Sequence, residues 1–116
     1  MNRYGIVYYN NIECGIIKET EDGFIFAYNK EYLESSNAKP ISLNLPLSKE
    51  EYFSTMLHPF FDGLIPEGWL LQIAINKWGL KHNDRMGLLL TVCEDTIGAV
   101  SVCGVIKWDV YAVAKN

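Results

Sequence analysis

The chain has 116 residues, the length of one domain that can bury a hydrophobic core without disulfides or a structural metal. Apolar residues make up 49% of the chain and charged residues 21%, a composition that excludes an intrinsically disordered protein. Ten basic against fourteen acidic residues give a net charge of -4, which argues against binding nucleic acid through phosphate neutralisation.

The N-terminal quarter predicts a three-stranded antiparallel meander. Residues 3–9 are rich in β-formers, and Asn10-Asn11 favours a tight hairpin turn because asparagine tolerates positive φ. The second strand is expected over Ile12 to Thr20, followed by a turn at Glu21-Asp22-Gly23. The third strand, Phe24 to Tyr28, places its aromatic residues on one face and its aliphatic residues on the other.

The next segment predicts a turn and then an edge strand. Residues 29–38 are polar and turn-like. Residues 40–46 begin and end with proline. Between the prolines, the apolar residues Ile41, Leu43 and Leu45 occupy every second position, so they are expected to point inward. Prolines at both ends suit a strand at the edge of a sheet.

A short helix is expected after this strand. Ser48 is followed three residues later by Glu51, which is a capping-box pattern. The pattern predicts a helix over residues 49–57 that stops before Pro59, because proline disfavours the helical conformation in the residue that precedes it.

A longer helix is expected between Pro66 and Gly79, since proline suits a first helical position and glycine a C-terminal stop. At about 100° per residue, five apolar side chains fall within an arc of about 140°, which is the expected core face. These five residues are Leu70, Leu71, Ala74, Ile75 and Trp78.

Trp69 points away from this core face, about 190° from the centre of the arc. It shares the polar side of the helix with Gln72 and Asn76, and Ile73 also lies off the core face. An aromatic side chain in this position is typical of a binding anchor. The alternative is that a second layer of the same domain covers it. The expected partner-binding residues are Trp69, Ile73, Pro66, Glu67, Gln72 and Asn76.

The last elements complete an α+β fold. Asn83-Asp84 predicts the start of a helix that carries Met86 and the leucines at 88–90. Residues 98–106 have the β-branched content of a strand that returns to the meander. We therefore expect one domain over residues 1–116, with a small antiparallel sheet packed by about three helices.

Targeting and cysteine patterns indicate a cytoplasmic protein without a membrane partner. Residues 1–10 lack the pattern of a signal peptide, and no apolar run approaches the roughly 20 residues that span a bilayer. Cys14, Cys93 and Cys103 are odd in number and widely spaced, so they are expected to be small buried hydrophobes in a reducing compartment.

The sequence does not predict an enzyme, a metal site or a cofactor. No two glycines stand in a phosphate-binding frame, and a G-x-S-x-G nucleophile elbow is absent. His58 and His82 lack metal-ligand spacing to each other or to a cysteine. Glu67 lies in the first turn of its expected helix, where the helix dipole explains a negative charge without a catalytic role.

Several of these segments together resemble a known family. Residues 60–69, F-F-D-G-L-I-P-E-G-W, resemble the F-F-x-x-L-L-P-E-G block of the N-terminal subdomain of HipA-type serine/threonine toxin kinases. Residues 41–47 resemble the family's S-L-S-L-P-L strand, and residues 24–33 its F-x-Y-x-x-x-Y-L stretch. Residues 94–100 resemble its D-x-x-G-A-V strand, so the similarity covers residues 4–106. Cys93 and Gly63 depart from the more usual family residues.

The resemblance implies a function that the residues alone do not. A HipA-type kinase continues for several hundred residues that carry its catalytic machinery, so the chain is expected not to be the kinase. In split systems of this type, the small subdomain is a separate protein, HipS, beside a shortened kinase, HipT, and a DNA-binding HipB. The resemblance implies an antitoxin that binds HipT directly and HipB through the complex, and so prevents phosphorylation of an aminoacyl-tRNA synthetase. One alternative is a scaffold that bridges HipT and HipB without inhibition, and another is a small ligand-binding or enzymatic module.

Overall fold

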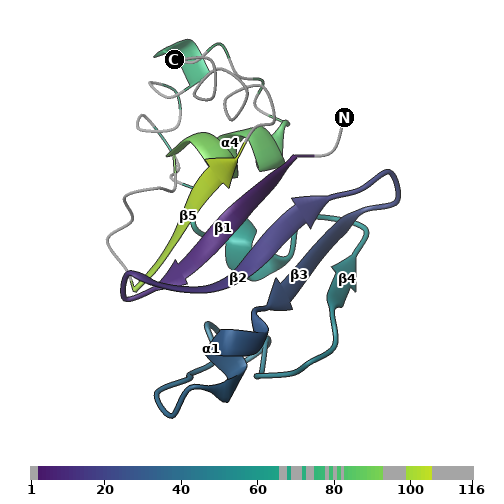
Figure 1. Cartoon of the computed structure of the whole chain (residues 1–116). Coiled ribbons are helices and arrows are strands. Elements are labelled where there is room, and N and C mark those ends of the chain that lie inside the picture. The colour runs from purple at the N-terminus through teal and green to yellow at the C-terminus, as the bar shows by residue number, and fades with distance from the viewer. Residues whose placement is uncertain are drawn as a thin grey trace, which may run out of the picture.

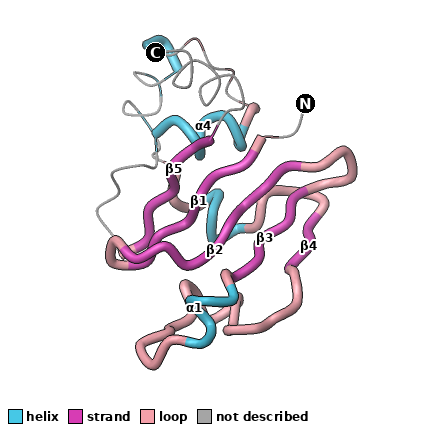
Figure 2. Tube along the Cα trace, viewed as in Figure 1, coloured by secondary structure: helices cyan, strands magenta, loops and turns pink. Residues whose placement is uncertain are grey.

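The computed structural model describes residues 3–65, 68, 72, 75–77, 79, 81, 83–92 and 99–105. In this part of the chain, a five-stranded antiparallel sheet with the order β4-β3-β2-β1-β5 is combined with short helices (Figures 1 and 2). The predicted α+β class is confirmed. In chain order the elements are β1 (Tyr4–Tyr9), β2 (Ile12–Glu19), β3 (Phe24–Tyr28), α1 (Lys30–Glu34), β4 (Tyr52–Ser54), α2 (Pro59–Asp62), α4 (Arg85–Val92) and β5 (Val100–Val105).

The predicted meander of β1, β2 and β3 is confirmed, and so is its first turn. Asn10 and Asn11 have φ angles of 50° and 67°, in the left-handed region that asparagine tolerates. Tyr9 therefore pairs directly with Ile12 across the turn.

The predicted return strand is β5, which lies antiparallel to β1 at the edge of the sheet. Gly104 of β5 lies against Leu90 of α4, and a Cβ atom at this glycine would come within 2.7 Å of the Leu90 carbonyl oxygen. The absence of a side chain therefore lets α4 pack closely on β5.

The edge strand predicted over residues 40–46 is wrong. Ile41 and Leu45 are buried as expected, but Leu43 is 95% exposed. The chain turns at Leu43 and Asn44, and a single bridge joins Ser42 to Leu45. Because the chain reverses here, the alternation of apolar residues does not correspond to one side of a strand.

Two tyrosine hydroxyl groups bind the backbone of this segment and of the residue just before it. Tyr28 accepts a hydrogen bond from the backbone N–H of Ile41 at 3.0 Å and donates one to the carbonyl of Leu45. Tyr32 of α1 accepts from the N–H of Lys39 at 2.9 Å and donates to the carbonyl of the same residue at 2.6 Å. The two rings stack at a centroid distance of 6.0 Å. Side-chain hydrogen bonds thus replace strand pairing in this segment.

The helix predicted over residues 49–57 is also wrong, because this segment contains the edge strand β4. Tyr52 and Phe53 pair with β3, where aromatic residues fit the pleated surface. The Ser48 hydroxyl accepts a hydrogen bond from the N–H of Glu50 at 3.0 Å, two residues on, and so forms a local turn. The stretch 29–38, predicted as a turn, contains the short helix α1.

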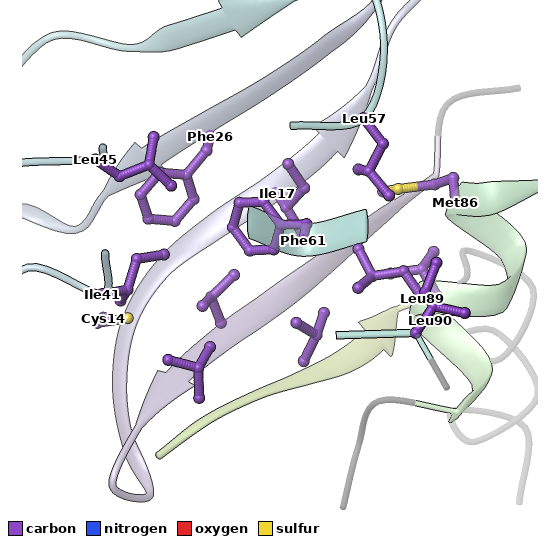
Figure 3. Packing of buried hydrophobic residues seen from close by; sticks show 14 of the residues in the cluster. Cys14, Ile17, Phe26, Ile41, Leu45, Leu57, Phe61, Met86, Leu89 and Leu90 are labelled. Carbon is purple, nitrogen blue, oxygen red and sulfur yellow. The ribbon is translucent and has the colours of Figure 1, made fainter. Parts of the chain in front are cut away.

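The hydrophobic core lies between one face of the sheet and the helices α2 and α4 (Figure 3). Phe61 of α2 packs on Phe26 of β3 with ring centroids 5.4 Å apart, and both side chains are fully buried. Full burial of a large apolar side chain stabilises the fold by about 1.5 to 3 kcal/mol. α4 adds Met86, Leu88 and Leu89 to the same layer. Among the helices described, none is long and apolar enough to cross a membrane.

Candidate partner-binding surface

The predicted partner-binding helix is described at a few positions. Residues 68, 72 and 75–77 are helical, and Gln72 and Asn76 are exposed. The Gln72 side-chain amide donates a hydrogen bond to the Asn76 carbonyl oxygen at 3.2 Å, as expected for residues one turn apart. Ile75, expected on the core face, is half-buried and packs against the core.

The other four predicted contact residues, Pro66, Glu67, Trp69 and Ile73, lie outside the described residues. The structure therefore brings Gln72 and Asn76 together on an exposed side of the helix. The partner contact of all six residues remains a prediction.

A network of ion pairs lies near the start of α4. The Arg3 guanidinium donates to both carboxylate oxygens of Glu19, each at 2.9 Å, and to both oxygens of Asp84, at 2.8 and 3.0 Å. Hydrogen bonds from Arg3 lower the pKa of Asp84, and the two carboxylates, Glu19 first, hold the pKa of Arg3 well above its usual range. Asp84 also accepts from the backbone N–H of Gly87 at 3.1 Å, the geometry of a helix cap.

A second ion pair joins α4 to α2. The Arg85 side chain donates to the carboxylate of Asp62 at 2.7 Å. This contact ties together the two helices that cover the core. The sequence predicted a helix start at Asn83-Asp84, and the cap formed by Asp84 confirms it.

These ion pairs border an open groove of about 570 Å³. Glu19, Asp62 and Arg85 form part of its polar wall, and Met56, which is 73% exposed, adds an apolar side chain. The walls of this groove come from β2, the loop before α2 and the start of α4, which are far apart in the chain. Spacing along the sequence cannot reveal such a site.

The carboxylates that line this groove are paired with arginines, so neither Asp62 nor Asp84 is placed as a free general acid or base. The described residues include no group of three or more potential metal ligands. Burial raises the pKa of Cys14 to about 12, which makes its thiol a poor nucleophile at neutral pH.

His58 has a structural role at the start of α2. Its Nδ1 atom accepts a hydrogen bond from the backbone N–H of Phe60 at 3.0 Å, and Pro59 occupies the first helical position. The sequence placed His58 at the end of a helix, whereas the structure makes it the residue that caps the next one. Burial lowers its pKa, which favours the neutral ring that can accept this bond.

Comparison with known proteins identifies the family of this domain. The model of the HipA N-terminal domain matches residues 5–103. The solved structure of the N-terminal domain of HipA toxin superposes with a TM-score of 0.67 at 28% sequence identity, over 90% of this chain and 94% of that one.

Sequence relatives include one small protein and two much larger ones. An uncharacterized protein of Haemophilus influenzae is 32% identical over 100 residues, which cover 86% of this chain and 91% of that protein. Putative kinase Y4dM of Sinorhizobium fredii is 32% identical over 84 residues, 67% of this chain but 20% of the kinase. Putative kinase Y4mE of the same organism is 30% identical over 77 residues, 66% of this chain and 18% of that protein. The chain therefore belongs to the HipA N-terminal domain family.

Proposed function

We propose that this protein is a HipS-type antitoxin that binds a HipT-type serine/threonine kinase and prevents phosphorylation of the kinase's target, an aminoacyl-tRNA synthetase. The observation that carries the proposal is the family match, which covers residues 5–103. The size of the relatives supports it. The same domain makes up most of one small relative and about a fifth of two relatives named as putative kinases.

In this proposal the protein is cytoplasmic, and it binds its partner without being an enzyme itself. The paired state of Asp62 and Asp84 supports the absence of catalysis by these two residues, because ion-paired carboxylates are poorly placed for proton transfer. A HipB-type repressor would then join the assembly through the kinase.

The binding surface in this proposal is the side of the helix that presents Gln72 and Asn76, both exposed. Trp69 is its anchor, supported by Ile73 and flanked by Pro66 and Glu67. A tryptophan of about 150 to 250 Å² that becomes buried in a kinase pocket contributes several kcal/mol before association costs are subtracted. Such an anchor obstructs the active site or holds the kinase in an inactive arrangement.

Co-expression with a HipT-type kinase followed by size-exclusion chromatography tests the proposed complex. We expect the two proteins to elute together at micromolar concentration. Trp69→Ala should release the chain from the complex, while Asn37→Ala, in an exposed turn outside the proposed surface, should not. Separate elution of the wild-type proteins would contradict the proposal.

A further inference from the structure

The face of the sheet opposite the core is also apolar. In strand register, one row across it reads Phe53, Ile25, Lys18, Tyr4 and Val105. The neighbouring row reads Ala27, Ile16, Ile6 and Cys103. Lys18 is the one charged residue in these two rows.

This composition is unusual for a sheet face that meets water. Antiparallel sheets with one solvated face normally alternate apolar residues inward with polar residues outward. Here Phe53 is 55% exposed and Tyr4 is 38% exposed. Figure 1 shows the sheet from this side, with α2 behind it, and none of the described helices lies across the face. An extended apolar surface of this kind marks an interaction site.

The charges at one end of the face indicate what it binds. A groove of about 630 Å³ has Ile16 and Ala27 among its lining residues, together with Tyr4, Lys18 and Lys30. Both lysines are exposed, and neither forms an ion pair with any residue in the described ranges.

Two acidic residues also lie near the groove. Glu31 is one of its lining residues, and Glu13 accepts a hydrogen bond from Asn29 at 3.0 Å. With two lysines against Glu31, the groove walls carry a net positive charge in a chain whose net charge is -4. An apolar segment with a carboxylate complements the apolar residues and the two lysines that line this groove.

The size of the face argues against a second copy of the chain as the occupant. Five strands at about 4.8 Å spacing and about five residues along each strand give a flat outline of roughly 400 Å². Six of the nine side chains in the two rows are only partly exposed, so the accessible area of the face is not much larger than this outline. A stable dimer buries about 800 Å² on each partner. The face is therefore too small to hold two copies together by itself, but large enough to extend an interface with a partner that is also bound elsewhere.

We propose that this face is a second docking surface for the partner kinase, and that it receives an apolar segment with a carboxylate that faces Lys18 and Lys30. The inference rests on the proposed function, because it takes the HipT-type kinase as the partner. It adds a contact area on the open side of the sheet, separate from the helix that carries Gln72 and Asn76.

Calorimetric titration of the kinase with two matched pairs of variants tests the inference. Lys18→Glu reverses the charge on the face, and Lys39→Glu makes the same change on an exposed loop. Phe53→Ala removes an apolar side chain from the face, and Leu43→Ala removes one that is 95% exposed in the turn after α1. We expect Lys18→Glu and Phe53→Ala to weaken binding at least tenfold, and both controls to stay within twofold of wild type. Thermal melts show whether each variant is folded, and Lys30→Glu is measured beside Lys18→Glu so that one charge reversal remains if the other variant unfolds.

The outcomes separate the two proposals. If the wild-type chain does not bind the kinase, the proposed function is wrong. The proposal that the kinase occupies this face is then wrong as well. If the wild-type chain binds but Lys18→Glu, Lys30→Glu and Phe53→Ala bind within twofold of it, the second docking surface is wrong and the proposed function stands. Equal weakening by Lys18→Glu and Lys39→Glu would also overturn the inference, because it would indicate a general charge effect.

Discussion

Arg3 and Asp84 lie 81 positions apart in the sequence, and the Arg3 guanidinium donates to both carboxylate oxygens of Asp84. The same arginine holds Glu19, so one side chain connects the residue before β1, the end of β2 and the start of α4. Because Asp84 also caps α4, this contact fixes where the helix begins above the sheet.

Removal of the Asp84 charge should destabilise the fold modestly. Asp84→Asn keeps a side chain that can cap α4 but loses the charge-assisted bonds to Arg3. Partial exposure screens the pair, so we expect a loss of about 1 kcal/mol in the free energy of unfolding, measured by urea denaturation. Asp22→Asn, a neutralisation in an exposed turn, is the control and should change stability by less than about 0.5 kcal/mol. An equal effect of both variants would contradict this role.

The contact between Arg3 and Asp84 should also make the free energy of unfolding depend on pH. Hydrogen bonds from Arg3 hold the pKa of Asp84 below its ordinary value of 3.8. The folded state therefore binds this proton more weakly than the unfolded state. The resulting stabilisation is fully present above the ordinary pKa and is lost as the pH falls through the lowered value. We expect the stability of Asp84→Asn to fall less steeply with acid than that of wild type. Parallel curves below pH 5 would show that Asp84 does not contribute.

The His58 cap predicts a second, milder pH effect. His58→Ala leaves the Phe60 N–H without its acceptor and should cost about 1 kcal/mol, whereas His58→Asn keeps an acceptor at this position. Because the pKa of His58 is lowered in the fold, its contribution is present above its ordinary value of 6.5 and is lost as the pH falls. Urea denaturation at pH 7.5 and pH 5.5 should therefore show a larger acid-induced loss for wild type than for His58→Asn. The same loss in both proteins would assign it to another group.

Tyr28 should contribute more to stability than a tyrosine on the surface. Tyr28→Phe removes the hydroxyl that bonds Ile41 and Leu45, and leaves two backbone groups near the core without that partner. Such a change typically costs about 1 to 3 kcal/mol. Tyr4→Phe, on the exposed face of the sheet, is the control and should be nearly neutral. Ultraviolet titration offers an independent check, because burial raises the pKa of Tyr28 to about 12 and this tyrosine should ionise late.

The two sides of the predicted binding helix should respond oppositely to truncation. Trp69→Ala should change the unfolding free energy by less than about 1 kcal/mol and weaken kinase binding by about 2 kcal/mol or more. Leu70→Ala, on the expected core face, should cost about 2 to 5 kcal/mol of stability, while its folded fraction still binds. Thermal melts and binding titrations of both variants provide the comparison. If Trp69→Ala unfolds the domain as severely as Leu70→Ala does, Trp69 belongs to the core.

The parts of the fold that local chemistry determines were predictable from the sequence. Asn10-Asn11 forms its turn because few other pairs tolerate two positive φ angles, and Asp84 starts α4 because its carboxylate accepts a backbone N–H. The alternation of β3 placed Phe26 and Tyr28 on one face, and the structure shows that this face is the buried one.

The errors occurred where distant contacts decide the local structure. Residues 40–46 alternate like a strand, but the Tyr28 hydroxyl bonds Ile41 and Leu45 on both sides of a turn. Ser48 and Glu51 match a capping box, yet Tyr52 and Phe53 gain more from pairing with β3 than from one turn of helix.

The same limit applies to the surfaces. The polar side of the helix around Gln72 was visible in the sequence because it depends on helical periodicity alone. The groove beside Asp62 and Arg85, and the rows that surround Lys18, require the strand register and the tertiary packing. No spacing along the chain encodes them.

The most direct test of the account is a phosphorylation assay with purified HipT-type kinase, its aminoacyl-tRNA synthetase target and increasing amounts of this chain. We expect phosphorylation of the synthetase to fall to background when the chain saturates the kinase, and Trp69→Ala to require at least tenfold more protein for the same inhibition. Undiminished phosphorylation at a concentration where chain and kinase elute as one complex would contradict the antitoxin function and favour a scaffold that bridges the kinase to a DNA-binding partner.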